Sequence, residues 1–381
     1  MEKYVSRIMV LQAIFLCCVI PGNSQVQHRI IIKLSVPDKG KSDSATYFLA
    51  SDMNQWNPGD NTYRFELTDQ GFQLSIPFTD SLKMQFKITR GNWSRGESDE
   101  DGYGAPNREL AVFGDTSILV KVIGWTDLVP RKHTASPNVH LLADSFPMPS
   151  LHSTRRIWIY LPASYSWSHK RYPVIYMQDG QNLFDRATTA FGTEWKVDET
   201  MDSLISSGKR EYIIVGIESG EKRLQEYLPY YSSHLQNPEG KLYADFMIRE
   251  LIPYVDSHYR TLKDAANRSV AGSSMGALIS LYTLLEYPKK FNSGGIFSCS
   301  YWVVDQFEKV IVHDKINQAL SVFLYAGDSE MQSLIGNTDT MANLLRKNPG
   351  ARVKTSYVVG GQHSERYWQK PFMDYILWLQ Q

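Results

Sequence analysis

The sequence predicts a small all-β sandwich domain followed by a larger α/β domain, whose mainly parallel sheet is flanked by helices. Three observations support this prediction. Short apolar runs separated by turn residues fill the region 26–128, as in β-sandwiches. From about residue 139, continuous apolar runs alternate with helical patterns, which is typical of a parallel sheet covered on both faces. Within that second region, residues 268–276 have the pattern of a strand, a sharp turn and the start of a helix.

Composition limits the classes of function. The chain has 381 residues, enough for two domains, and 43% of them are apolar. Lys+Arg and Asp+Glu both number 40, so the net charge is zero, which argues against a nucleic-acid-binding protein. Aromatic residues reach 12%, including 9 Trp and 22 Tyr. Such rings serve either sugar-binding surfaces or core packing, and composition alone leaves both open.

Residues 1–24 have the features of an export signal. Lys3 and Arg7 give a positive start, residues 8–20 form an apolar run, and Gly22 and Ser24 offer small residues for cleavage before position 25. The apolar run is too short to span a membrane, and no other segment approaches that length. The sequence therefore predicts a secreted or periplasmic protein without a membrane span.

The cysteines bear on the compartment. Cys17 and Cys18 lie within the signal, but the residues before them are poor matches to a bacterial lipoprotein signal, which favours cleavage over lipid anchoring. Cys299 would be the one cysteine of the mature chain and cannot form an internal disulfide. An exported protein without disulfides points to a bacterial periplasm or outer surface. The sequons at Asn92 and Asn267 would matter only in a eukaryotic host.

The first domain is expected at residues 25–128. Its predicted strands cover residues 29–36, 45–50, 72–77, 84–89 and 117–123, separated by turn-forming Asn, Pro, Gly and Asp. Within it, Asn-Gln-Trp-Asn-Pro at 54–58, Lys-Ile-Thr-Arg-Gly-Asn-Trp at 87–93 and Pro-Asn-Arg at 106–108 follow one another. This series resembles the starch-binding-like carbohydrate-binding modules. Trp56 and Trp93 are therefore glycan-binding candidates whose rings would stack on sugar faces; the alternative is that they brace the loops of the sandwich.

A basic, proline-flanked stretch at 129–138 is expected to be a linker with solvated charges, and the α/β domain to occupy residues 139–381. Strands are predicted at 139–142, 155–161, 173–177, 212–217, 268–273, 321–326 and 353–359. Helices are predicted at 195–205 and 243–254, after residue 276, and near the C-terminus up to residue 379.

Three chemically reactive side chains follow strands of this domain. Ser274 lies in Gly-Ser-Ser-Met-Gly at 272–276, a G-x-S-x-G turn that lifts a serine hydroxyl clear of the sheet. Two acids, Asp328 and Glu330, follow the strand at 321–326, and His363 follows the strand at 353–359. The order serine, acid, histidine is that of α/β-hydrolase triads, and carboxyl ends of parallel strands meet at one edge of a sheet. We expect these residues to converge there.

This set of residues predicts acyl transfer through a serine. Ser274 would attack an ester carbonyl while His363 accepts its proton and later protonates the leaving alcohol. A carboxylate, for which the sequence favours Glu330 over Asp328, would orient the imidazole. The tetrahedral intermediate needs two N–H donors, which are expected from Met275 and Gln181; losing one would cost about 2.7–4 kcal/mol. No cofactor or metal is expected, because phosphate-loop, dinucleotide and zinc patterns are missing from the sequence.

Four segments of the second domain together resemble the esterase D family of α/β hydrolases. They are Tyr-Met-Gln-Asp-Gly-Gln-Asn-Leu-Phe at 176–184, Arg223 with Glu-Tyr-Leu-Pro at 226–229, the serine turn, and Gly-Gln-His-Ser at 361–364. The resemblance implies that Gly180, Arg223 and Tyr227 contribute to substrate binding, although Arg223 and Tyr227 either shape the pocket or merely brace it. In feruloyl esterases of this family the acid follows a glycine by three positions, which maps onto Glu330 after Gly327, with Glu in place of the usual Asp.

The family includes feruloyl and acetyl-xylan esterases, siderophore esterases and related acyltransferases. With the carbohydrate-module resemblance, it implies an exported serine esterase that acts on acyl or feruloyl decorations of polysaccharide. A siderophore esterase cleaving catechol trilactones is the alternative enzyme, and a glycan-binding protein with an inactive hydrolase domain is the alternative from another class. The expected partners are a small ester or polysaccharide ester and a glycan, with no nucleic acid. The acyl and alcohol groups, hydrolysis versus transfer, and oligomeric state are not predicted by the residues.

Overall fold

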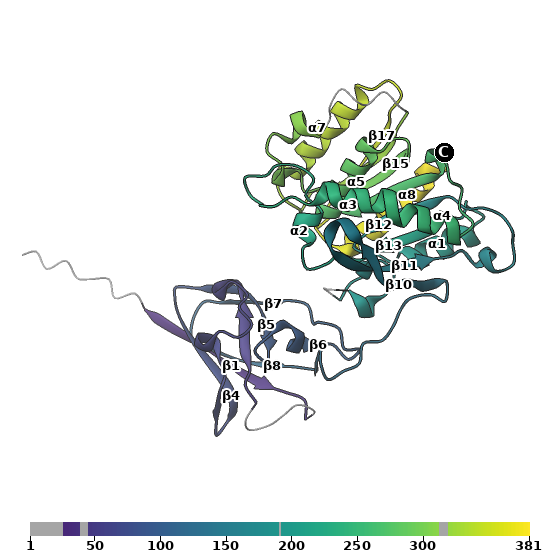
Figure 1. The fold of residues 1–381 in the computed structure, drawn as a ribbon. Coiled ribbons are helices and arrows are strands. Elements are labelled where there is room, and N and C mark those ends of the chain that lie inside the picture. The colour runs from purple at the N-terminus through teal and green to yellow at the C-terminus, as the bar shows by residue number, and fades with distance from the viewer. Residues whose placement is uncertain (1–25, 39–44, 190–191, 312–318) are drawn as a thin grey trace, which may run out of the picture. The chain divides into compact units, whose positions relative to one another are not determined.

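A computed structural model describes residues 26–38, 45–189, 192–311 and 319–381 (Figure 1). The predicted export signal lies outside the described residues. The chain divides into two compact units, one formed by residues up to 98 together with 105–128, the other by 99–104 with 129–381. None of the described helices combines the length and hydropathy that a membrane span requires.

The N-terminal unit is β-rich, with two larger sheets and one pair of short strands. The first sheet has the order β3-β4-β1-β8 and the second the order β2-β5-β7, while β6 pairs with β9. The bounds are β1 Gln27–Ser35, β2 Phe48–Ser51, β3 Glu66–Thr68, β4 Gly71–Thr79, β5 Leu82–Thr89, β6 Glu97–Ser98, β7 Arg108–Val112, β8 Thr116–Lys121 and β9 Gly124–Trp125. Alternate residues of β4 and β5 are buried, as expected for strands with one face on a core. Ile32 and Leu74 of the first sheet share one apolar cluster with Phe86 and Ile88 of the second.

The second unit contains an eight-stranded sheet in the order β10-β11-β13-β12-β14-β15-β16-β17. The bounds are β10 Val139–Met148, β11 Ser153–Tyr160, β12 Val174–Gln178, β13 Ile213–Ile217, β14 Arg268–Ser273, β15 Ser293–Phe297, β16 Ser321–Gly327 and β17 Arg352–Val358. The pairs from β13 through β17 are parallel, and β10 and β11 add an antiparallel edge. The predicted α/β class with a mainly parallel sheet is therefore confirmed.

Helices cover both faces of this sheet (Figure 1). Their bounds are α1 Val197–Ser206, α2 Arg223–Glu226, α3 Gly240–Phe246, α4 Ile252–His258, α5 Met275–Glu286, α6 Phe307–Val310, α7 Leu334–Arg346 and α8 Glu365–Leu379. Val174 and Tyr176 of β12 enter one apolar core, which α5 and α7 complete. Ile175 and Met177 point the other way into a second core, which α1 and α8 complete. Burial on both faces explains why these strands are continuously apolar.

Three details differ from the expectations. The strand β15, which contains Gly294 and Gly295, was not predicted. It lies between β14 and β16, so the strand that precedes the two acids is not the direct neighbour of the strand that precedes Ser274. The predicted helix at 243–254 consists of α3 and α4 joined by a π-helical turn, Met247–Leu251. The predicted strand at 139–142 is the start of the longer β10.

The stretch 129–138, expected to be a linker, is hydrogen-bonded to the second unit and groups with it. Arg131 donates to the carbonyl of Ala187 at 3.0 Å, and His133 Nδ1 lies 2.6 Å from a carboxylate oxygen of Asp185. The backbone N–H of Ser136 donates to Asp198 at 2.7 Å. These hydrogen bonds attach the segment to loops of the second unit.

Candidate active site

Ser274 lies on a strained turn between β14 and α5. Its backbone has φ 56° and ψ −124°, a region that serine rarely adopts. The turn is tight because Gly272 and Gly276 let strand and helix approach closely: a Cβ on Gly272 would lie 2.6 Å from the carbonyl oxygen of Gly276. Glycine is therefore required at position 272, because a larger residue would collide with the first turn of α5.

Positive φ recurs at the carboxyl ends of three neighbouring strands. Asp179 follows β12 with φ 56°, Ser274 follows β14, and Ser298 follows β15 with φ 48°. Non-glycine residues with positive φ are uncommon, and such strain concentrates at functional sites. The three strained residues therefore mark one edge of the sheet.

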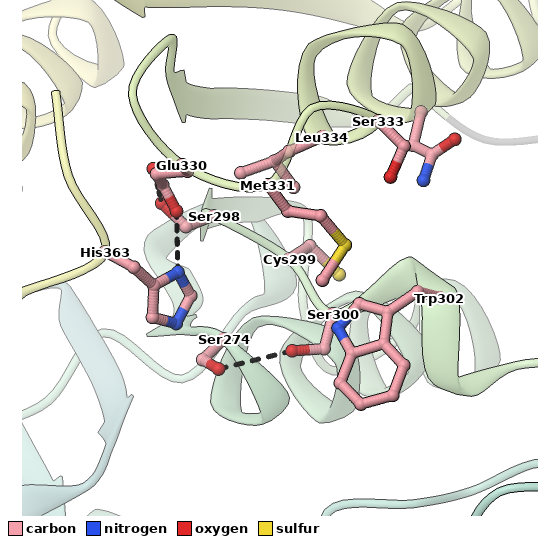
Figure 2. Close-up of a pocket in the computed structure, with 11 residues that line it drawn as sticks. Ser274, Ser298, Cys299, Ser300, Trp302, Glu330, Met331, Ser333, Leu334 and His363 are labelled. Atoms are coloured by element: carbon pink, nitrogen blue, oxygen red, sulfur yellow. Dashed lines mark hydrogen bonds and ion pairs between the residues drawn. The ribbon is translucent and has the colours of Figure 1, made fainter. Parts of the chain in front are cut away.

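The carboxylate of Glu330 meets the imidazole of His363 at this edge (Figure 2). Glu330 Oε2 lies 2.6 Å from His363 Nδ1, and the glutamate side chain is buried. Its other oxygen, Oε1, accepts hydrogen bonds from the backbone N–H of Gly327 at 2.8 Å and from the hydroxyl of Ser298 at 2.7 Å. Both oxygens are thus fixed, so the carboxylate holds the ring in one orientation.

Asp328, the alternative acid, has different partners. One of its oxygens accepts from the backbone N–H of Gly360 at 2.6 Å and from the hydroxyl of Ser329 at 3.1 Å. The side chain is exposed and makes no contact with His363 among the described residues. Asp328 therefore ties two loops together, and Glu330 is the acid that contacts the imidazole.

Sequence reasoning missed two residues that support this pair. The indole Nε1 of Trp368 donates to Ser298 Oγ at 2.9 Å, so Ser298 links Trp368 to Glu330. The ring of Trp368 also packs edge-on against His363, with centroids 5.2 Å apart. Ser298 follows the strand that the sequence pattern did not predict. Trp368 could have been found from its position one helical turn after Ser364, at the start of α8.

Ser274 and His363 face each other across the same cavity. Figure 2 shows the ring nitrogen that is remote from Glu330 on the side of Ser274. In the part of the chain that the structure describes, the Ser274 hydroxyl is hydrogen-bonded to Ser300 Oγ, at 3.2 Å, and not to the imidazole. Catalytic hydrogen bonds often tighten only when substrate binds.

The two expected backbone donors belong to residues near Ser274: Met275 follows it in the chain, and Gln181 lines a cavity that Ser274 also lines. Met275 is the first residue of α5, and Gln181 lies in the 3-10 turn Gly180–Asn182 that follows β12. No acceptor from the described residues takes either N–H. The side chain of Gln181 is fixed by Ser219, whose hydroxyl and backbone N–H it meets at 2.8 and 3.0 Å. The loop is thus preorganised with a free donor.

Arg223 and Tyr227 occupy different positions behind this loop. Arg223 forms two hydrogen bonds to Asp179, at 2.7 and 2.8 Å, and lines the cavity. Burial alone would lower the pKa of the Arg223 guanidinium, but the Asp179 carboxylate raises it above its usual value. Tyr227 is fully buried, and its hydroxyl accepts from the backbone N–H of Asp179 at 3.3 Å. Tyr227 therefore braces the loop and does not reach the cavity.

Gly180 also acts through packing. A Cβ on Gly180 would lie 2.7 Å from the backbone of Gly216, so glycine lets the turn approach β13. Gly180 is buried and is absent from the walls of the pockets described next. That Gly180 contributes to substrate binding therefore remains a prediction.

Two pockets meet at Ser274 and His363. The first, of about 330 Å³, is lined further by Cys299, Ser300, Trp302, Met331, Leu334 and Asn337 (Figure 2). The second, of about 540 Å³, is lined by Asp179, Gln181, Asn182, Ser219, Arg223 and Glu365. Burial raises the pKa of the Cys299 thiol well above its usual value, so Cys299 is an inert wall of the first pocket. Within the described ranges no cluster of His, Cys, Asp and Glu could hold a metal ion.

The glycan-binding candidates lie in the N-terminal unit. Trp93 is 46% exposed, and its ring centroid is 6.4 Å from that of Trp56, with the planes tilted by 39°. Arg90 is paired with Asp127 and lies over the ring of buried Trp125. Arg90 thus braces the fold, while Trp93 presents an open ring to solvent.

The sequence is similar to those of known bacterial proteins. Over 241 residues the chain is 26% identical to "Uncharacterized protein YbbA" of Bacillus subtilis (strain 168), covering 59% of this chain and 92% of that protein. It is 27% identical over 154 residues to an endo-1,4-beta-xylanase/feruloyl esterase of Xylanibacter ruminicola, covering 39% of this chain but only 20% of that protein.

The fold also resembles solved structures. An enterochelin esterase from Shigella flexneri superposes with a TM-score of 0.53 at 15% identity, covering 89% of this chain and 88% of that one. At this identity the likeness concerns the fold alone. Residues 149–379, more than half of the chain, match the Esterase family, described as "Putative esterase". The chain therefore belongs to the Esterase family, with the α/β-hydrolase fold of feruloyl and enterochelin esterases.

Proposed function

We propose that the protein is an exported serine esterase, in which Ser274 is the nucleophile, His363 the general base and acid, and Glu330 the acid that orients the imidazole. One observation carries this proposal: Glu330 Oε2 lies 2.6 Å from His363 Nδ1 at a pocket that Ser274 also lines. Serine is a weak nucleophile at neutral pH, and an oriented imidazole is what activates it.

The reaction proceeds in two halves. Ser274 Oγ attacks the ester carbonyl carbon as His363 Nε2 takes its proton, and the carbonyl oxygen becomes an oxyanion. The free N–H groups of Met275 and Gln181 stabilise that oxyanion. The carbonyl then re-forms, the alcohol leaves with the proton from His363, and an acyl-enzyme remains. Water, deprotonated by the same imidazole, attacks the acyl-enzyme and regenerates Ser274.

The proposed substrate is an acyl or feruloyl ester on a polysaccharide. A relative that is named endo-1,4-beta-xylanase/feruloyl esterase supports it, together with the carbohydrate-module motifs of the first domain. The exposed ring of Trp93 adds an aromatic surface of the kind that stacks on a sugar face. The N-terminal segment with its positive start and apolar run supports export.

A siderophore esterase is the second candidate, because the fold likeness to the enterochelin esterase extends over 89% of this chain. A panel of purified esters separates the two candidates. The leading proposal expects faster hydrolysis of methyl ferulate and acetylated xylan than of a catechol trilactone. Preference for the trilactone would replace the polysaccharide substrate by the siderophore.

Covalent labelling tests whether the site is catalytic at all. A fluorophosphonate probe should label the native chain and fail to label Ser274→Ala, with Ser300→Ala as a control that keeps the nucleophile. An unlabelled native chain that still retards on a xylan or starch gel would instead establish a glycan-binding protein with an inactive hydrolase domain.

A further inference from the structure

Glu365 is a buried carboxyl group that the proposed reaction does not use. It is the first residue of α8 and lies two residues after His363, and it lines the second pocket together with Ser274 and His363. Only 7% of the residue is exposed. A buried acid next to a reaction centre requires either a structural or a functional explanation.

Among the described side chains, one donor reaches this carboxyl group. Oε1 accepts a hydrogen bond from Asn182 Nδ2 at 2.9 Å. No donor from another described residue meets Oε2, and no salt bridge in the described part of the chain neutralises the group. The nearby guanidinium of Arg223 forms two hydrogen bonds with Asp179. Glu365 thus offers an acceptor oxygen to whatever fills the second pocket.

The pocket around Glu365 favours a neutral ligand with several hydroxyl groups. Trp368 is the one apolar side chain among its walls, and the others bear hydroxyl, amide, carboxyl or guanidinium groups. The walls contain two carboxyl groups, those of Asp179 and Glu365, and one guanidinium, that of Arg223, which is paired with Asp179, so they do not favour an anionic ligand. A volume of about 540 Å³ suits a ligand of the size of one or two sugar rings.

The first pocket has fewer charged and more apolar side chains in its walls than the second. Apart from Glu330 and His363, which hold each other, it has no charged side chain, and Trp302 and Met331 are about half exposed there. An aromatic or aliphatic acyl group therefore fits the first pocket. The alcohol half of the ester then occupies the second, within reach of the histidine that must protonate it.

We propose that Glu365 is a specificity residue that binds a hydroxyl group of a neutral, polyhydroxylated alcohol, the leaving half of the ester, in the second pocket. This inference rests on the proposed esterase function. A site built to bond a hydroxyl discriminates strongly against an alcohol that lacks it. The enzyme should therefore prefer a sugar ester to the methyl ester of the same acid.

Two substrates with one acyl group test the proposal: methyl ferulate and ferulate esterified to arabinose. In Glu365→Ala, kcat/KM for the arabinose ester should fall about tenfold to a hundredfold, mainly through KM, and that for methyl ferulate should change less than threefold. Glu365→Gln keeps an acceptor for Asn182 and replaces the other oxygen by a donor, so it should fold normally. Its kcat/KM for the arabinose ester should fall less than that of Glu365→Ala. Asp374→Asn, on the exposed side of α8, is the matched control.

The possible results separate the proposals. Equal losses on both esters in Glu365→Gln would overturn the inference, because they would mean that Glu365 only positions the site. If the native enzyme hydrolyses neither ester, the feruloyl-ester substrate of the proposed function fails, and saturation-transfer NMR then tests the pocket without turnover. Feruloyl arabinose should bind Ser274→Ala, and the added Glu365→Ala change should weaken binding about tenfold or more; equal binding by both would also overturn the inference.

Discussion

Glu330 and His363 are joined by a 2.6 Å contact although they follow different strands, β16 and β17, and are 33 residues apart in the chain. The two strands run parallel and adjacent, so their carboxyl ends deliver the acid and the imidazole to one place. The contact identifies Glu330 as the residue through which the imidazole is oriented.

Glu330→Gln should lower kcat on an aryl ester by roughly 10² to 10⁴, because an amide cannot stabilise the imidazolium. Asp328→Asn should leave kcat within about threefold, since Asp328 contacts Gly360 and Ser329 and not the imidazole. Steady-state kinetics on both variants check this. A larger loss in Asp328→Asn than in Glu330→Gln would reverse the assignment.

Ser298 is expected to be a positioning residue. Ser298→Ala removes one hydrogen bond to Glu330 and leaves the indole N–H of Trp368 without its acceptor. We expect a loss of about tenfold to a hundredfold in kcat with KM unchanged, since a hydrogen bond to a charged group contributes about 1.5–3 kcal/mol. Trp368→Phe interrupts the same network, so the double variant should lose less than the sum of the two single losses in free energy. Strict additivity would show that the two residues act independently.

Arg223→Met should destabilise the fold. The change leaves the buried carboxylate of Asp179 without its cation and weakens the support of the turn Gly180–Asn182 that follows it. Because the Arg223 side chain is about a third exposed, we expect a loss of about 2–3 kcal/mol in the free energy of unfolding, below the range for a fully buried pair. Urea titration measures it. Lys222→Met, whose side chain is exposed, should change the value by less than about 0.5 kcal/mol.

Stability should depend on pH through Glu194. Burial, and then the nearby carboxylate of Glu199, raise the pKa of Glu194 from 4.5 to about 7. The folded state therefore holds a proton that the unfolded chain releases, so the free energy of unfolding falls as pH rises from about 4.5 to 7.

Glu194→Gln should flatten this slope and raise stability at pH 8. Part of the slope will remain, because burial also raises the pKa of Asp198, to about 8. Thermal unfolding at a series of pH values between 4.5 and 8 checks the prediction. An unchanged slope in Glu194→Gln would contradict the assignment of the proton to this group.

The sequence predicted those parts of the fold and of the site that arise from residues close together in the chain. The continuous apolar runs that became β12 and β13 and the glycine spacing around Ser274 each have a short-range cause, so the sequence alone located them. The strand β15 was missed because two of its five residues are glycines, which carry no side chain to signal a buried strand. Glycine is needed there because Tyr375 of α8 packs closely against the strand: a Cβ on Gly295 would lie 2.9 Å from the ring of Tyr375.

The remaining site residues depend on contacts between distant segments. Ser298, Trp368 and Glu365 reach the site from β15 and α8, and no local motif links them to Ser274. For the same reason, sequence reasoning could not separate the roles of Arg223 and Tyr227, since burial of one and exposure of the other arise only in the folded chain.

The positive φ of Ser274 places an L-residue with a side chain where backbone energetics would favour glycine. Ser274→Gly should therefore unfold at a higher denaturant concentration, with a gain of roughly 1 kcal/mol, while losing all turnover. The serine hydroxyl at this turn thus lowers the stability of the fold, and a single substitution to glycine should give a more stable protein without activity.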